Sequence, residues 1–296
     1  MTLDQLRIFV AVAEREHVTR AAEALNLVQS AVSAAIATLE GRHATKLFHR
    51  VGRGIQLTEP GRVFLDEARA VLARAEAAEL VLADLSGLRR GTLALQASQT
   101  IASHWLPAHL VAFRRAYPEI VLRLEVGNTA EAAAAVREGR AELGFVEGER
   151  DDPALASTEV ARDELVLVVA PTHPFAGGGA IGREALAAAD WVLREPGSGT
   201  RSAFEAALEA RGLPPAGLKV ALELPSNEAV RAAVEAGGGA SVLSASVVAG
   251  ALRAGTLVRA DLTLPARLFR VLRHRERYRS RAADALLALI ARAPAG

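Results

Sequence analysis

Three short polar runs in the C-terminal two thirds of the sequence have the residue types that hold a small anion. Each run follows an expected strand and opens an expected helix, where backbone N–H groups are free and the helix dipole favours negative charge. Hydroxyl groups add further hydrogen-bond donors, and ordinary helix capping is the alternative interpretation for each run. The runs are Ser98-Gln99-Thr100, Asn128-Thr129 and Ser198-Gly199-Thr200.

Charged residues beside these runs modify the expected chemistry. Glu147 follows the third expected strand of this half and argues against a purely cationic pocket. Arg194 either adds positive charge or pairs with the adjacent Glu195. We predict a binding site for a small carboxylate, phosphate or sulfate-like ligand.

A second polar set near the N-terminus has the residue types that contact nucleic acid. Gln29, Ser30, Ser33 and Ala34 fall on the exposed side of one expected helix, where side chains can meet base edges. Basic residues gather from position 42 to 62 against a single carboxylate, Glu59. A solvated surface is the alternative for so short a run. We expect three arginines to lie on phosphates, namely Arg20, Arg50 and Arg53.

The elements that position this second set form a winged helix-turn-helix. Thr2 and Gln5 make a capping-box pattern ahead of a first helix, and a second short helix is expected to start at Thr19. A third helix is expected over 29–40, with an apolar face that includes Val32. Alternation around two glycines over 50–58 predicts a small hairpin, the wing.

Residues 6–61 are similar to the DNA-binding signature of the LysR family, and the likeness extends more loosely over the rest of the chain. The family fold implies that the second helix of the motif enters the major groove. The matching residues are Leu6, Phe9, Val10, Val12, Ala13, Thr19, Ala21, Ala22, Leu25, Asn26, Gln29, Ala31, Val32, Ser33, Ile36, Leu39, Glu40, Leu47, Phe48, Arg50, Leu57, Thr58 and Gly61.

This chain departs from the family pattern at the start of the recognition helix. The family usually has Ser-Gln-Pro where this chain has Val28-Gln29-Ser30, and Val28 cannot cap a helix. Ala34 and Ala35 stand where the family favours polar or basic residues. Direct base reading is therefore expected from Gln29 and Ser33, with DNA shape and wing contacts adding selectivity.

A long helix is expected over 61–90, with apolar residues alternating at four and three positions. This spacing is the a/d pattern of a coiled coil, and the resemblance implies a linker helix that pairs two subunits. A helix packed on its own domain is the alternative. The expected contact positions are Phe64, Ala68, Val71, Ala75, Ala78, Leu82 and Leu85, and Ser86-Gly87 is expected to end the helix.

From Thr92 onward, expected strands and helices alternate, which predicts two α/β units with parallel sheets and a return strand near 268–273. The pattern looks like the two-lobed, periplasmic-binding-protein-like (type 2) domain of LysR proteins. The predicted fold is thus a mainly α winged helix-turn-helix (1–60) and an α/β effector domain (91–296), joined by a long linker helix (61–90). The lobes are expected at 91–162 with 267–296, and at 163–266.

Enzymatic chemistry is not expected from this sequence. It has no cysteine, and its seven histidines lack metal spacing, so neither a metal site nor a cofactor is predicted. Gly177–Gly182 fits a nucleotide-binding glycine pattern but does not follow its strand directly, so we interpret it as a turn. No apolar run reaches the ~20 residues of a membrane helix and no secretory signal is evident, which favours the cytoplasm.

The resemblance implies a transcription regulator whose partners are double-stranded DNA with an interrupted inverted repeat near a promoter, a small-molecule effector and RNA polymerase. A homodimer that assembles into a tetramer is expected. One alternative is a solute-binding protein, which would need an export signal and lack residues 1–90. Another is an architectural DNA binder with a vestigial sensor.

Overall fold

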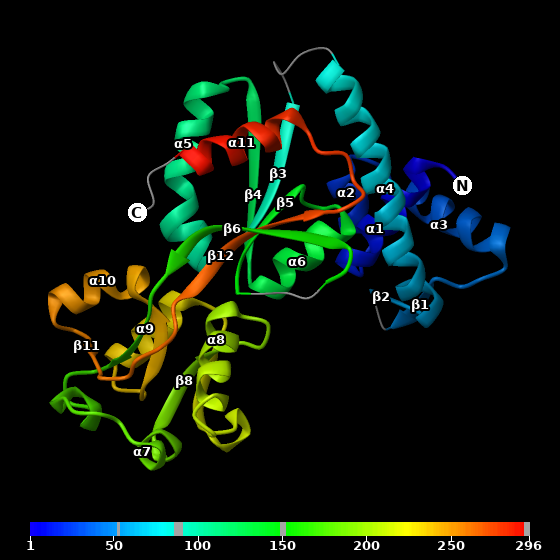
Figure 1. Cartoon of the computed structure of the whole chain (residues 1–296). Coiled ribbons are helices and arrows are strands. Elements are labelled where there is room, and N and C mark those ends of the chain that lie inside the picture. The colour runs from blue at the N-terminus through cyan, green and yellow to red at the C-terminus, as the bar shows by residue number, and fades with distance from the viewer. Residues whose placement is uncertain (52–53, 86–90, 149–151, 293–296) are drawn as a thin grey trace. The chain divides into compact units, whose positions relative to one another are not determined.

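The computed structural model describes residues 1–51, 54–85, 91–148 and 152–292, and the chain divides into two compact units. Arg53 of the expected phosphate contacts lies outside the described residues, as do Ser86 and Gly87, where the linker helix was expected to end. The N-terminal unit contains α1 (Leu3–Arg15), α2 (Val18–Ala24), α3 (Gln29–His43), β1 (Phe48–Val51), β2 (Gly54–Leu57) and α4 (Glu59–Leu85) (Figure 1).

The start of the chain folds as its local sequence predicts. The Thr2 hydroxyl accepts a hydrogen bond from the Gln5 backbone, and the Gln5 side chain accepts one from the Thr2 backbone, which completes the capping box. The second helix begins at Val18, one residue before the prediction, because the His17 side chain caps it. As predicted, Val28 makes no side-chain cap for α3. β1 and β2 form the predicted hairpin.

Two apolar clusters hold the N-terminal unit together on opposite sides of α1. On one side, Ile8 and Val12 pack against α2 and α3. On the other, Leu6 and Phe9 pack against the wing and the first turns of α4, where Phe64 and Ala68 belong to the same cluster. These first two positions of the predicted coiled-coil pattern therefore pack within their own unit.

The C-terminal unit has two lobes. Lobe I is built on a five-stranded sheet of order β4-β3-β5-β12-β6. Helices α5 and α11 cover the face that carries Leu95 and Phe145, and α6 covers the face that carries Val146. Its elements are β3 (Gly91–Ser98), a π-helical turn η1 (Ile101–Trp105), α5 (Leu106–Ala116), β4 (Ile120–Gly127), α6 (Thr129–Glu138), β5 (Leu143–Glu147), β6 (Leu155–Asp163), β12 (Arg267–His274) and α11 (Arg281–Arg292).

Lobe II packs two small sheets, of order β10-β7-β11 and β8-β9. Its core gathers around Trp191 and Phe204 on one side and Val168 and Val230 on the other. Its elements are β7 (Leu165–Val169), η2 (Pro174–Gly177), α7 (Arg183–Ala188), β8 (Asp190–Arg194), α8 (Gly199–Glu209), η3 (Pro215–Gly217), β9 (Lys219–Leu224), α9 (Asn227–Glu235), β10 (Ser241–Ser244), α10 (Ala245–Ala254) and β11 (Val258–Arg259).

Two features differ from the sequence prediction. The predicted parallel unit of lobe I is confirmed, because β3 pairs parallel with β4 and β5. Among the described strands of lobe II, only β8 and β9 pair parallel, and the prediction is wrong for β7, which pairs antiparallel with both β10 and β11. The return strand β12 pairs antiparallel with β5 and β6. Strand β6 and helix α10 were not predicted. β6 runs beside β12 between the lobes (Figure 1), and its many exposed side chains hide it from a hydrophobicity pattern.

Among the described residues, no single helix is long and apolar enough to span a membrane. Only α2 and α3 taken together, bent by 111°, reach that length and composition. The same residues contain no cluster of His, Cys, Asp or Glu that could hold a metal ion.

Candidate nucleic-acid interface and ligand cleft

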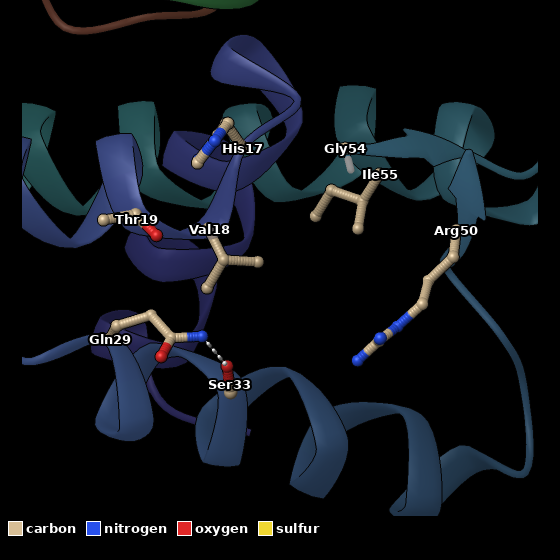
Figure 2. Close-up of a pocket in the computed structure, with 8 residues that line it drawn as sticks. All are labelled: His17, Val18, Thr19, Gln29, Ser33, Arg50, Gly54 and Ile55. Atoms are coloured by element: carbon tan, nitrogen blue, oxygen red, sulfur yellow. Dashed lines mark hydrogen bonds between the residues drawn. The ribbon is translucent and has the colours of Figure 1, made fainter. Parts of the chain in front are cut away.

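The N-terminal unit has a hollow of about 330 Å³ between α2, α3 and the wing. Figure 2 shows that Val18 and Ile55 give it an apolar part, while Gln29, Ser33 and Arg50 bring polar atoms to it. It holds three of the predicted nucleic-acid contacts and no carboxylate among its lining residues. These are His17, Val18, Thr19, Gln29, Ser33, Arg50, Gly54 and Ile55.

Gln29 and Ser33 are neighbours on successive turns of α3. The Gln29 side-chain amide donates to Ser33 Oγ across 3.3 Å, which leaves the Gln29 carbonyl oxygen free to accept from a base or a water (Figure 2). Ser30 and Ala34 are also exposed on α3 but lie outside the hollow. Arg20 is exposed on α2 and is likewise outside it.

Sequence reasoning missed His17 and Thr19, which reach the hollow from the start of α2. His17 accepts the Arg20 backbone N–H through Nδ1 at 3.5 Å, so its neutral form carries its proton on Nε2. The sequence places His17 just before the expected second helix, but histidine is not among the favoured capping residues, so its role was not predicted.

A buried carboxylate joins α3 to the wing. Glu40 accepts hydrogen bonds from Lys46 Nζ at 2.6 Å and from the backbone of Leu47 and Phe48 at 2.9 and 3.2 Å. Burial alone would raise the pKa of the Glu40 carboxyl, but these hydrogen bonds outweigh it and hold the pKa below its usual value. Lys46 is thereby paired with Glu40, although its side chain is 80% exposed, whereas Arg50 faces the hollow.

The predicted ligand residues of the C-terminal unit lie where the two lobes meet, and most are buried. Lobe I contributes Ser98, Gln99, Thr100, Asn128, Thr129 and Glu147, and lobe II contributes Ser198, Gly199 and Thr200. Several hydrogen bonds connect the lobes directly. Gln99 donates to Pro225 O at 2.8 Å, Thr100 accepts from Asn227 at 3.1 Å, and Asn128 donates to Glu195 at 3.3 Å.

The polar residues at the helix starts where the lobes meet make different hydrogen bonds. Asn128 caps α6 by accepting the Glu131 backbone N–H, so the capping alternative holds for this residue. Thr129 instead donates to the buried Glu147 carboxylate at 2.8 Å. Ser198 precedes α8 without a side-chain capping hydrogen bond, and Ser98 Oγ is buried with no hydrogen-bond partner in the described part of the chain.

Glycine at position 199 allows the lobes to approach closely. A Cβ atom there would stand 2.7 Å from Thr129 Oγ1 and 2.8 Å from Glu147 Oε2, both in lobe I. Such distances leave no room for a side chain without movement of one lobe.

Two buried arginines lie at the junction of the lobes. Arg194 pairs with Glu195 at 2.7 Å, which decides the alternative left open by the sequence, and also donates to Asn227. Arg267, at the start of β12, donates to Asp163 at 2.6 Å and to Thr200 at 2.8 Å. Sequence analysis missed Arg267 because it sits at the very edge of the expected return strand.

Comparisons with known proteins agree with this architecture. Residues 3–62 match the model of the bacterial regulatory helix-turn-helix protein, lysR family, and residues 86–295 match the LysR substrate binding domain. The chain belongs to the LysR family of transcriptional regulators. The resemblance and fold class expected from the sequence are thereby confirmed, and the protein is a regulator rather than an enzyme.

Relatives of this regulator include the uncharacterized HTH-type transcriptional regulator YeiE of Escherichia coli strain K12, 39% identical over 95% of this chain and 94% of that protein. A full-length OxyR variant with one cysteine replaced, from Pseudomonas aeruginosa, has a similar fold, with a TM-score of 0.71 at 22% identity over 99% of this chain and 96% of that one. CbnR complexed with its target DNA gives 0.70 at 22% identity over 99% of both chains. LysR regulators bind DNA and small-molecule effectors.

Proposed function

We propose that this regulator reads an interrupted inverted repeat near a promoter, with Gln29 and Ser33 at base edges. The hollow between α3 and the wing supports this, because it brings the Gln29 carbonyl oxygen, the Ser33 hydroxyl and Arg50 to one exposed surface. Ser30 and Ala34 extend the same exposed helix toward the groove. Arg20, Arg50 and Arg53 contact phosphates, which position the protein without reading sequence.

Two subunits pair through α4, and pairs associate into a tetramer. Beyond the turns that pack on α1, Val71 and Leu82 of the predicted pattern are 42% and 69% exposed, which is unusual for apolar side chains repeated along one helix. A two-fold dimer presents two winged units, which matches an inverted repeat. In this arrangement residues 1–60 bind DNA, residues 61–90 pair the subunits and residues 91–296 bind the effector.

A small oxyanion binds between the lobes as the effector. The observation that supports this is the Ser98 hydroxyl, which is buried without a hydrogen-bond partner in the described part of the chain, and α8 also starts without a side-chain cap. Helix starts and hydroxyl groups both stabilise negative charge. Gln99, Thr100, Asn128, Thr129, Glu147, Ser198, Gly199 and Thr200 complete the surroundings.

Effector binding changes the hydrogen bonds between the lobes, which shifts the arrangement of subunits and the bend of the DNA. Access of RNA polymerase to the promoter then changes. We place this activity in the cytoplasm.

Fluorescence anisotropy tests the DNA part directly. The full chain is titrated against the DNA upstream of its own gene and against a scrambled duplex, across a range of salt. Selective binding with a steep salt dependence is expected, since phosphate contacts release counterions. Equal weak binding to both duplexes would favour an architectural DNA binder, and no binding by folded protein would contradict the proposal.

A further inference from the structure

A buried glutamine on β3 has no role in the fold described so far. Gln96 is 6% exposed on β3, two residues before Ser98, which is 2% exposed. Because side chains alternate along a strand, both lie on the face opposite Leu95 and Ala97, which pack into the main core of lobe I. Within the described residues, neither Gln96 Oε1 nor Ser98 Oγ has a hydrogen-bond partner.

Both side chains lie on the face of the sheet that α6 covers, toward the end of the strands where α6 begins. Ser98 pairs with Gly127 in the register of β3 and β4. A Cβ atom on Gly127 would stand 3.2 Å from Gln96 Nε2 and 2.5 Å from Glu131 Oε2. The Gln96 amide nitrogen, a donor, thus lies on the side of the Glu131 carboxylate, an acceptor. This orientation leaves Gln96 Oε1 as the acceptor without a partner.

The charged groups at the junction of the lobes are already paired with one another. Glu147 ends β5 and Asp163 ends β6, with side chains that are 3% and 7% exposed, and Glu195 of lobe II accepts a hydrogen bond from Asn128 of lobe I. The two cleft guanidinium groups are already engaged, Arg194 by Glu195 and Arg267 by Asp163. A ligand that offers only acceptor atoms would leave Gln96 Oε1 unsatisfied, whereas proteins rarely bury polar atoms without partners.

We propose that Gln96 selects an effector that is a small acid carrying its own O–H or N–H donor. The donor meets Gln96 Oε1, while an acid oxygen meets the Ser98 hydroxyl. This inference rests on the oxyanion site proposed above and narrows it to a chemical class. Hydrogen phosphate meets the requirement, but sulfate, which has the same shape and no proton at neutral pH, does not. Lactate meets it, but propionate does not.

The test compares these matched pairs on the full chain by isothermal titration calorimetry, at neutral pH and constant ionic strength. In at least one pair, the donor-bearing acid is expected to bind at least about tenfold more tightly than its partner, because the partner leaves a buried acceptor unpaired. Gln96→Met should reduce that ratio to near one. Gln56→Met, on the exposed side of the wing, serves as the control and should leave the ratio unchanged.

The outcomes separate this inference from the function on which it rests. If sulfate and propionate bind as well as their partners, or if Gln96→Met keeps the preference, the selection by Gln96 is wrong while the oxyanion site stands. If none of the four acids binds, both fail, although selective DNA binding remains a separate measurement. If Gln96→Met does not fold, Gln96→Asn, which withdraws the carbonyl oxygen by one methylene, is expected to lose the preference in the same way.

Discussion

Arg267 Nη1 lies 2.8 Å from Thr200 Oγ1, so the strand that returns to lobe I is hydrogen-bonded to the first turn of α8 in lobe II. The same guanidinium donates to Asp163 and is 3.8 Å from Glu147. One side chain therefore neutralises buried carboxylates of lobe I while it contacts lobe II.

Replacing Arg267 with Met should strongly destabilise the C-terminal unit. The substitution leaves Asp163 and Glu147 buried without their cation, and breaking a buried ion pair in this way costs about 3–5 kcal/mol. Urea unfolding followed by circular dichroism measures the loss. Arg259→Met is the control, because its partner Glu164 is 58% exposed and exposed pairs contribute about 0–1 kcal/mol. Equal effects of the two variants would contradict the role given to Arg267.

Gly199→Ala should force the lobes apart or strain their contact. The new methyl group would meet Thr129 and Glu147 within 2.8 Å, and such overpacking costs about 1–3 kcal/mol. Thermal unfolding and small-angle scattering measure the two effects. Gly217→Ala, where nothing lies within 4 Å, is the matched control and should behave as the parent protein. An unchanged Gly199→Ala variant would show that the lobes are not in close contact in solution.

Arg50→Gln should weaken DNA binding for all sequences alike. Loss of one phosphate contact per subunit lowers the slope of log K against log salt by about 0.9 for each contact. Anisotropy titrations across salt measure the slope. Arg62→Gln is the control, since Arg62 pairs with Glu59 at 3.3 Å and does not line the hollow. A change confined to one operator sequence would instead assign Arg50 to base reading.

Acid should loosen the junction between α3 and the wing through Glu40. Its pKa is lowered in the folded state from 4.5, so its contribution is present above that value and is lost as the pH falls through the folded-state pKa. Unfolding of the N-terminal unit should therefore become easier in this acid range. Glu40→Gln should remove that part of the pH dependence and cost about 1–3 kcal/mol at neutral pH. Glu59→Gln, an exposed carboxylate at 81%, should leave the pH profile intact.

Leu82→Lys should weaken subunit pairing if α4 is the dimer helix. Leu82 is 69% exposed in the single chain, so the substitution is expected to leave folding intact while placing a charge in the paired seam. Sedimentation velocity should show a shift toward monomer. A lysine at Val63, which is 62% exposed and lies outside the predicted pattern, should not cause this shift.

Much of the fold could be predicted because its signals are local. The capping box of Thr2 and Gln5, the wing and the alternation of strands and helices depend on neighbours in sequence, and helix α9 begins at Asn227 and ends at Glu235 as expected. The lack of a cap at Val28 was predicted on the same ground.

The remainder depends on partners far apart in the chain. β6 carries exposed Ser157, Thr158 and Glu159 and is held by its pairing with β12, more than a hundred residues away, which no local pattern contains. The antiparallel pairing of β7 and β10 likewise depends on contacts between strands that are far apart in the chain. The surroundings of Gln96 and Arg267 are formed by strands distant in sequence. The sequence therefore predicted which residues lie where the lobes meet, but not the ion pairs that they form.

The ring of Phe9 has a mechanical consequence for the N-terminal unit. Its centroid lies 5.4 Å from that of Phe48 in the wing and 4.9 Å from that of Phe64 in α4. A tightly packed ring leaves no hinge between the wing and α4, since close-packed interiors resist small shifts. A rotation of α4 about its own axis would therefore turn the wing with it. In the proposed dimer paired through α4, such a rotation would change the spacing and angle between the two winged units, while each unit kept its own internal geometry.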